Sequence, residues 1–203
     1  AGLVTSVADG SVTVTATSGE VSDTAAATVA QVASTVELSP TTLSLTSIGD
    51  TATVTATVKD AAGTVMPGAT VSWATSSSSV ATVSDAGLVT AVADGSATIM
   101  ATSGALEATA AVTVAQVAAS IELSDTVLTF ASLSDTTQLT ATVKDANGAT
   151  MSGANVSWGA TGPAVTVSSS GLVTSVADGT ATITATSGSV SATASVTVTQ
   201  GAS

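Results

Sequence analysis

One nine-residue stretch occurs three times in the chain and restricts its fold more than any other feature. The copies begin at Gly2, Gly87 and Gly171, and each reads Gly-Leu-Val-Thr-x-Val-Ala-Asp-Gly. The spacing between them is 85 and then 84 residues, and each copy leads into an alternating segment that ends in Ala-Thr-Ser-Gly. A fixed period of this length predicts tandem copies of one small domain.

The repeat divides the chain into four parts. Residues 1–31 match residues 86–116, so they correspond to the second half of one repeat. Complete repeats are expected at residues 32–116 and 117–200, and residues 201–203 form a tail. Because the half-repeat lacks its first strands, we expect either that the sequence is a window on a longer array or that another chain supplies them.

Short alternating segments separated by turn residues predict β-strands in each repeat. From Thr51 to Val58, alanine and valine alternate with threonine, which is the period of a strand with one buried face. The leading strand is expected to break at Ser39-Pro40, because proline cannot donate a ladder hydrogen bond. Roughly seven or eight such strands per repeat, in a chain without cysteine, predict an all-β fold of tandem antiparallel β-sandwiches without disulfides.

The charge balance argues against several classes of partner. The chain has 14 acidic residues and two lysines, which gives a formal net charge of −12. Nucleic acids and anionic membranes are bound through Lys and Arg, so we expect no nucleic-acid partner. No uninterrupted apolar run approaches the roughly 18 to 20 residues of a membrane helix, so we expect no direct membrane insertion by this segment.

The residue types also argue against catalysis. A serine nucleophile needs a neighbouring base, yet the chain has no histidine. Lys59-Asp60 and Lys144-Asp145 lie in repeated turns, and we interpret them as solvated turn residues whose ion pairing contributes little. We therefore expect a protein that is not an enzyme, with no catalytic, cofactor-binding or metal-ligating residues.

Each complete repeat contains one tryptophan, Trp73 and Trp158. A sugar-stacking platform is one interpretation, but a carbohydrate-binding face normally needs more aromatic residues than these two and Phe130. We interpret both tryptophans as the structural core aromatic of a sandwich, carried by its third strand.

The repeated stretch ends in an Asp-Gly pair, which favours tight type I′ hairpin turns whose carboxylates bond local backbone N–H groups. An alternative is interdomain calcium, if Asp50, Asp60 and Asp145 meet at a domain junction, although no Asp-x-Asp-x-Asp-Gly loop supplies the usual ligands. The predicted hairpin-turn residues are Asp9, Gly10, Asp94, Gly95, Asp178 and Gly179.

The junctions between repeats contain no glycine, no proline and no polar run. Residues 28–36 and 112–121 pass directly from the last strand of one repeat to the first strand of the next. Flexible linkers are rich in glycine and serine, and these segments are not. We therefore expect the domains to stack end to end with limited freedom.

The order of motifs in each repeat resembles the bacterial immunoglobulin-like domain of group 2. The matching anchors are Ser39-Pro40, Ser72-Trp73 and residues 87–90 and 93–104, and the main departure is Asp125 where the pattern has proline. The resemblance implies a disulfide-free immunoglobulin-like sandwich of the kind found in cell-surface adhesins, surface-layer and other secreted proteins, and some phage virion proteins. Members of that family usually serve as spacers or stalks.

Two functions from different classes follow as hypotheses. The first is a non-enzymatic, extracellular segment of a bacterial cell-surface protein, a stiff stalk or spacer in adhesion whose partners are the neighbouring repeats of its own chain. The second is a self-assembling subunit of an extracellular filament, sheath or surface lattice, in which copies of the chain pair through open strand edges. The net charge of −12 opposes lateral contact at low salt.

Overall fold

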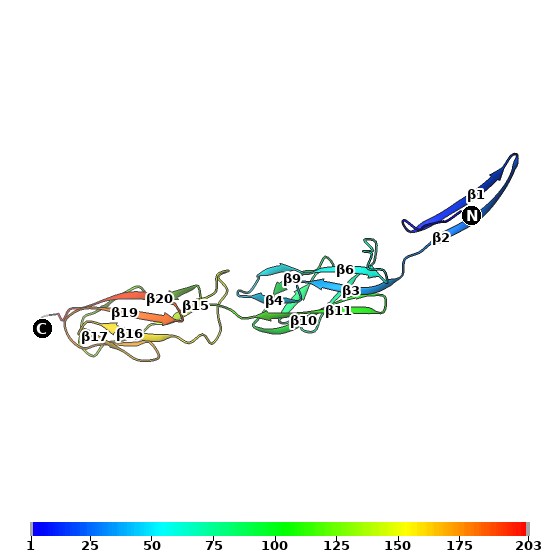
Figure 1. The fold of residues 1–203 in the computed structure, drawn as a ribbon. Coiled ribbons are helices and arrows are strands. Elements are labelled where there is room, and N and C mark those ends of the chain that lie inside the picture. The colour runs from blue at the N-terminus through cyan, green and yellow to red at the C-terminus, as the bar shows by residue number, and fades with distance from the viewer. Residues whose placement is uncertain (1, 202–203) are drawn as a thin grey trace.

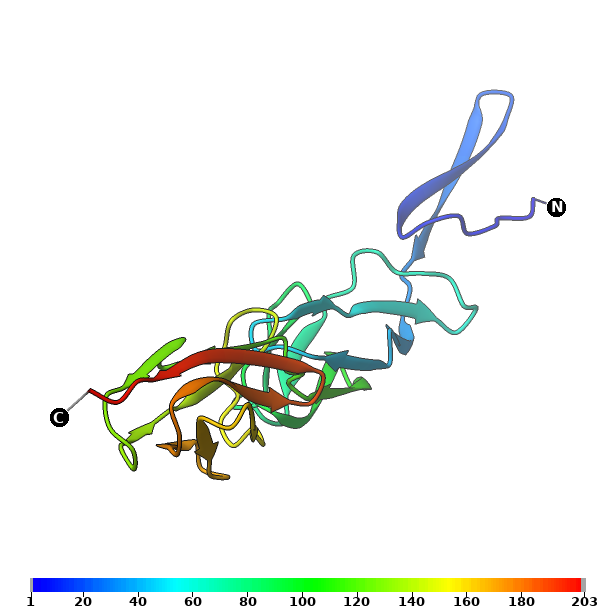
Figure 2. The same cartoon turned by 90° about the vertical axis from the view of Figure 1, so that its left-hand side faces the viewer.

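The structure, a computed structural model, describes residues 2–201 and is built from β-strands and turns, with no helix in that range. Figure 1 shows an N-terminal hairpin followed by two sandwich domains that lie end to end. The hairpin pairs β1 (Gly10–Ser18) with β2 (Val21–Val29) in antiparallel register, and Figure 2 shows it projecting away from both domains. The predicted all-β, disulfide-free tandem arrangement is confirmed.

Each sandwich domain has nine strands in the same order. The first domain contains β3 (Ala33–Ser39), β4 (Thr42–Leu45), β5 (Thr51–Thr53), β6 (Thr55–Asp60), β7 (Ser72–Thr75), β8 (Ala81–Val83), β9 (Leu88–Ala91), β10 (Gly95–Ser103) and β11 (Leu106–Val114). The second domain contains β12 (Ser120–Leu123), β13 (Val127–Phe130), β14 (Thr136–Gln138), β15 (Ala141–Lys144), β16 (Ser157–Thr161), β17 (Val165–Val167), β18 (Leu172–Ser175), β19 (Gly179–Ser187) and β20 (Val190–Val198).

The strands of each domain form two layers. In the first domain the sheet β4-β11-β10-β7 faces a layer made of β3-β6 and β5-β9-β8. In the second domain β13-β20-β19-β16 faces β12-β15 and β14-β18-β17. The pairs β4–β11 and β13–β20 are parallel, whereas the other pairs are antiparallel. The predicted antiparallel sandwich is therefore mixed at one edge of each domain.

The leading segment of the first domain accounts for its parallel edge. β3 pairs with β6 in one layer, and after Ser39-Pro40 the chain continues as β4, which pairs with β11 in the opposite layer. Because proline has no N–H group, the ladder of β3 cannot continue through it. The predicted break is confirmed, and one segment contributes a strand to both layers. In the second domain β12 and β13 switch layers in the same way around Asp125, so the switch itself does not require proline.

The strand predicted from Thr51 to Val58 is divided at Val54. β5, before this residue, pairs with β9, whereas β6, after it, pairs with β3. Val54 is fully buried, and its N–H donates to the carbonyl oxygen of Gly87 at 2.9 Å. The segment thereby connects the two parts of its layer, and Leu139 does the same in the second domain, where its N–H donates to Gly171.

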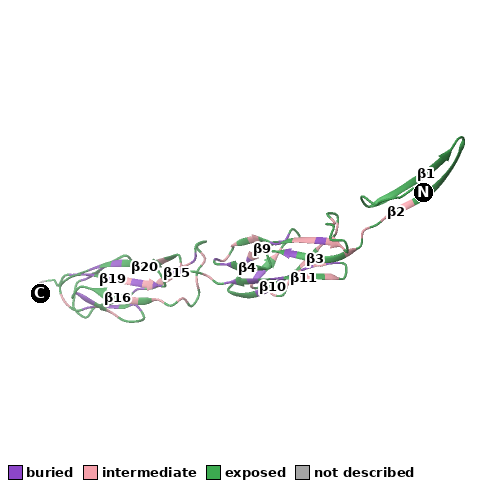
Figure 3. Ribbon diagram, in the orientation of Figure 1, coloured by how far each residue is buried: buried purple, intermediate pink, exposed green. Residues whose placement is uncertain are grey.

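Inward-facing residues of the two layers form one apolar core in each domain. Figure 3 shows the buried residues concentrated within the two sandwiches, while the hairpin is mostly exposed. Trp73 is half-buried and packs against the first core, and Trp158 packs against the second in the same way. The residues buried most completely in the first core include Ile99, Val54, Val89 and Val112, and those in the second include Leu139, Ile183, Val173 and Val196.

The glycine that opens the repeated stretch lies against the tryptophan. Gly87 has φ +76°, and a Cβ added to it would lie 2.2 Å from the Val54 carbonyl oxygen and 2.9 Å from Trp73 Cζ2. Gly171 has φ +86°, and its Cβ would lie 3.0 Å from Trp158 Cζ2. Only glycine adopts this backbone conformation without strain and leaves room for the ring.

The Asp-Gly pairs do not form the predicted type I′ hairpin turns. Asp94-Gly95 connects β9 to β10, and Asp178-Gly179 connects β18 to β19, so each pair crosses from one layer to the other. Asp9 likewise directly precedes β1, which begins at Gly10 and pairs with β2. A type I′ turn requires positive φ at both central residues, but Ser134 is the one non-glycine residue with positive φ within residues 2–201. The dipeptide rule fails here because it assumes that the flanking strands pair with each other.

Candidate functional site: an interdomain joint

The second domain meets the first at a buried carboxylate, that of Asp145, which follows β15. The residue is 2% exposed. Burial raises the pKa of Asp145, but hydrogen bonds outweigh that effect and lower the pKa below its ordinary value. The donors are the side chain of Gln116 and the backbone N–H groups of Ile48, Ala149 and Asn147. The carboxylate is therefore ionised at neutral pH.

The two oxygens of Asp145 have different partners. Oδ2 accepts a hydrogen bond from Gln116 Nε2 at 2.8 Å and another from the Ile48 N–H at 2.8 Å, both from the first domain. Oδ1 accepts the N–H groups of Asn147 at 3.1 Å and Ala149 at 2.9 Å, within its own turn. One side chain thus shapes its turn and fixes the turn against the neighbouring domain.

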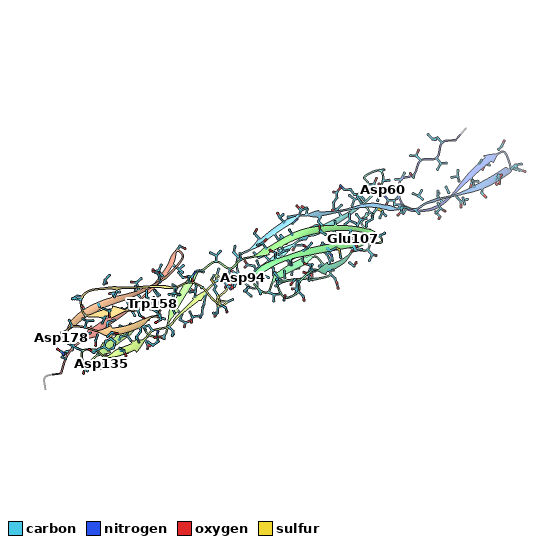
Figure 4. All side chains as sticks on the ribbon, turned by 90° about the horizontal axis from the view of Figure 1, so that it is seen from below. Asp60, Asp94, Glu107, Asp135, Trp158 and Asp178 are labelled. Atoms are coloured by element: carbon cyan, nitrogen blue, oxygen red, sulfur yellow. The ribbon has the colours of Figure 1, made fainter. Side chains whose placement is uncertain are left out.

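Gln116 is positioned by the aspartate of the repeated stretch. Its backbone N–H donates to Asp94 Oδ1 at 2.7 Å, while its side chain donates to Asp145. Figure 4 places Asp94 between the two domains. We call Asp94, Gln116 and Asp145 the joint relay, because together they connect a layer crossing in one domain to a turn in the next.

Asn147 makes a second contact across the joint. Its Nδ2 donates to the carbonyl oxygen of Ile48 at 3.0 Å and to Asp50 Oδ1 at 2.9 Å. The other oxygen of Asp50 accepts the N–H groups of Thr46 at 3.0 Å and Ser47 at 2.9 Å. Asp50 therefore shapes the loop that presents Ile48 to the second domain.

The contact consists of two complementary segments, which we call the docking loop (residues 46–50) and the receiving turn (residues 144–149). The docking loop offers an N–H group, a carbonyl oxygen and a carboxylate. The receiving turn offers a carboxylate and, two residues later, an amide. Each donor on one side therefore meets an acceptor on the other.

Asp9, Gln31 and Asp60 form an equivalent relay at the junction between the hairpin and the first domain. The Gln31 N–H donates to Asp9 Oδ1 at 2.7 Å, and Gln31 Nε2 donates to Asp60 Oδ2 at 2.9 Å. Asp60 Oδ1 accepts the N–H groups of Ala62 at 2.9 Å and Thr64 at 2.8 Å. The hydrogen bonds from Gln31 and from backbone N–H groups lower the pKa of Asp60.

In the third copy, the first half of the relay is present. The Gln200 N–H donates to Asp178 Oδ1 at 2.8 Å. In all three copies the glutamine follows the aspartate by 22 residues. The relay is therefore a property of the repeat and not of one junction.

The joint uses residues to which the sequence assigns other roles. Asp94 is predicted to accept hydrogen bonds from local N–H groups, but it accepts a hydrogen bond from the N–H of Gln116, 22 residues later. Asp145 is predicted to be solvated but is buried, because the preceding domain covers it. The glutamines are missing from the sequence-based candidates, although Gln31 and Gln116 recur with the period of the repeat.

The proposed calcium ligands do not form one site. Asp50 and Asp145 both lie at the second joint, where they accept N–H groups, whereas Asp60 lies at the first. Within residues 2–201, no group of three or more His, Cys, Asp and Glu side chains has an arrangement that could hold a metal ion. In the same range, no helix has the length and apolar character needed to cross a membrane.

The solved structures similar to this chain include a surface layer protein and two adhesins. Surface layer protein SbsC, domains 1–6, is 26% identical with a TM-score of 0.41; the match covers 95% of this chain and 32% of that one. The Escherichia coli adhesin FdeC is 22% identical over 94% of this chain and 74% of that one, with a TM-score of 0.47. The Yersinia pseudotuberculosis adhesin InvE is 15% identical over 81% of this chain and 58% of that one, with a TM-score of 0.38. The chain thus spans about a third of the length of the SbsC structure.

The comparison with protein families gives two matches. Bacterial Ig-like domain (group 2) matches residues 32–114, and a bacterial Ig-like domain matches residues 156–200. A comparison with curated proteins finds no match. The matched ranges cover strands of both sandwich domains. Residues 32–114 and 156–200 of the chain therefore belong to the bacterial immunoglobulin-like domain family.

Proposed function

We propose that the chain is a non-enzymatic structural segment of a bacterial extracellular surface protein and acts as a stiff tandem stalk or spacer in adhesion. The observation that carries this proposal is the joint relay, in which Gln116 connects Asp94 of one domain to the buried Asp145 of the next. A spacer needs length and resistance to bending. Repetition of the domain supplies the length, and the joint supplies the resistance.

The segment that connects the domains is itself held on both sides. The Val117 N–H donates to the Thr46 carbonyl oxygen of the first domain at 3.0 Å. Two residues later, the Ala119 N–H donates to the Lys144 carbonyl oxygen of the second domain at 2.8 Å. These two hydrogen bonds are only two residues apart in the sequence, so bending at the joint requires one of them to break.

A second candidate function is self-assembly into an extracellular filament, favoured by the exposed face of the hairpin. Val12 and Val14 of β1 are 54% and 39% exposed. Their counterparts in β10, Ala97 and Ile99, are 6% and 0% exposed, because the other layer of the sandwich covers them. Strands from another copy of the chain could cover the hairpin in the same way.

Negative-stain electron microscopy of bacteria that carry the protein, with light scattering of the purified chain, separates these functions. The stalk predicts separate slender rods on the cell surface and a monomeric chain. Continuous regular fibres, together with a chain that associates and seeds them, would contradict the stalk and support the filament.

A further inference from the structure

We propose that the far end of the second domain is a docking face for a second copy of the repeat at residues 117–200. The face would bind the receiving turn of that copy, the segment that reads Lys-Asp-x-Asn-Gly. This assignment rests on the stalk function and adds to it the surface and the partner by which an array of these domains is extended.

Half of the joint relay is already formed at this end. The Gln200 N–H donates to Asp178 Oδ1 at 2.8 Å, as the Gln116 N–H donates to Asp94 Oδ1 at 2.7 Å. Figure 4 shows Asp178 and Asp135 together at the C-terminal end of the second domain. Gln200 therefore occupies the position from which Gln116 donates to the receiving turn.

The counterpart of the docking loop, residues 131–135, shares two of its backbone hydrogen bonds. The Ser134 N–H donates to the Ser175 carbonyl oxygen, and the Ser175 N–H donates to the Asp135 carbonyl oxygen, both at 2.9 Å. In the first domain, the docking loop makes the two equivalent bonds with Ala91, at 3.0 and 2.9 Å. These two backbone bonds are thus formed without a partner domain.

Ser134 holds a conformation that suits the joint. Its φ is +68°, close to the +83° of its counterpart Gly49. Such a backbone is unfavourable for serine, and the Ser175 hydroxyl stabilises it by donating to the Ser132 carbonyl oxygen at 2.7 Å. A Cβ on Gly49 would lie 3.9 Å from Asn147 Nδ2, an ordinary contact, so a serine at this position does not block the receiving turn.

The face is accessible and has defined chemistry. Leu133 is 39% exposed, and Asp135 and Gln200 are also exposed, whereas their three counterparts in the joint are half-buried. The Leu133 N–H and the Gln200 amide require an acceptor, and the Asp135 carboxylate requires a donor. An aspartate and an asparagine two residues apart supply both, as Asp145 and Asn147 do in the joint.

The turn at residues 59–63 is a poorer partner for this face. It has Ala62 where the receiving turn has Asn147, so it offers the carboxylate of Asp60 without the amide. The face should therefore select repeats whose turn carries asparagine at this position.

The test extends the full chain by a second copy of residues 117–200, attached directly after Gln200. The chain has no cysteine, so Thr182→Cys in both copies gives unique sites for spin labels, and Thr182 is exposed. Double electron–electron resonance then measures the distribution of distances across the new joint. Thr98→Cys and Thr182→Cys, in a separate sample, measure the existing joint.

The expected result is a distribution across the new joint that is as narrow as the one across the existing joint. Asp145→Ala in the added copy should broaden it at least twofold, Asn147→Ala should broaden it less, and Gln200→Ala should broaden it while leaving both domains folded. Near-ultraviolet circular dichroism of the tryptophans checks that the added copy is folded.

A broad distribution at the new joint, with a narrow one at the existing joint, would overturn this assignment and leave the stalk function intact. Broad distributions at both joints would contradict the stalk function as well. A new joint that is narrow but unchanged by Asp145→Ala would also overturn the assignment, because the contact would then not use the receiving turn.

Discussion

Single residues with a fixed place in the repeat determine how each sandwich closes and how it meets its neighbour. Gly171 allows the backbone to lie against Trp158, and the carboxylate of Asp145 organises both its own turn and the contact with the first domain. In both cases the residue type follows from a contact that is distant in the sequence. Substitution at either position should therefore disturb a contact outside its own turn.

Gly171→Ala should destabilise the second domain by about 2 kcal/mol or more, because the residue has positive φ and the new Cβ would lie 2.5 Å from the Leu139 carbonyl oxygen and 3.0 Å from Trp158. Gly188→Ala is the matched control: Gly188 has φ +58° but nothing within 4 Å of its Cβ position, so the cost should be about 1 kcal/mol. Urea unfolding followed by tryptophan fluorescence measures both. Equal costs would show that the close approach to Leu139 and Trp158 contributes nothing.

The joint should be stable at neutral pH and open in acid. Hydrogen bonds hold the pKa of Asp145 below its ordinary value of 3.8, despite the opposing effect of burial. A lowered pKa stabilises the folded joint above the ordinary value, and this contribution is lost as pH falls through the lowered pKa. The NMR signals of the Gln116 side-chain amide should therefore shift with a midpoint below pH 3.8. A midpoint above that value would contradict this assignment, and Asp145→Asn should abolish the transition.

At the scale of strands and turns, the sequence predicts what is local and misses what depends on distant partners. The alternation of residue types around Val54 could be predicted, because a strand with one buried face alternates apolar and polar residues. The break at Ser39-Pro40 could be predicted because proline lacks the N–H that a strand ladder needs. The crossing between layers at Asp94-Gly95 could not, because a dipeptide does not show which strands its neighbours pair with.

The joint was predictable only in part. The absence of glycine, proline and polar runs near Gln116 favours closely stacked domains. The burial of Asp145 depends on Ile48, which lies 97 residues earlier, so no local pattern indicates it. Glutamine and both aspartates of the relay recur at the repeat period, but the sequence does not show that Gln116 lies between Asp94 and Asp145.

The strand ends that carry the two lysines should resist trypsin. Lys59 pairs with Glu37 and Lys144 with Glu122, each across neighbouring strands, and the lysine side chains are 28% and 33% exposed. Trypsin needs an extended, accessible segment, so cleavage of the folded chain should be at least about tenfold slower than that of the urea-unfolded chain. Gel electrophoresis over time measures both rates. Rapid cutting after Lys144 under native conditions would show that the receiving turn is loose.

For the whole molecule, we infer that the joint holds the two domains in one relative orientation. The domains lie end to end in Figure 1, and the connecting segment is hydrogen-bonded to both. Stiffness of this kind makes reach proportional to the number of repeats, whereas a flexible string of domains would extend only with the square root of that number.

The most direct test is the distribution of distances between spin labels on Thr98→Cys and Thr182→Cys, exposed strand positions in the two domains. We predict one narrow distribution, broadened by Asp145→Ala and unchanged by Asp125→Ala, which removes the same charge from an exposed position in the same domain. A broad distribution in the unsubstituted joint, or equal widths with and without Asp145, would show that the joint does not hold the domains in one orientation through this carboxylate.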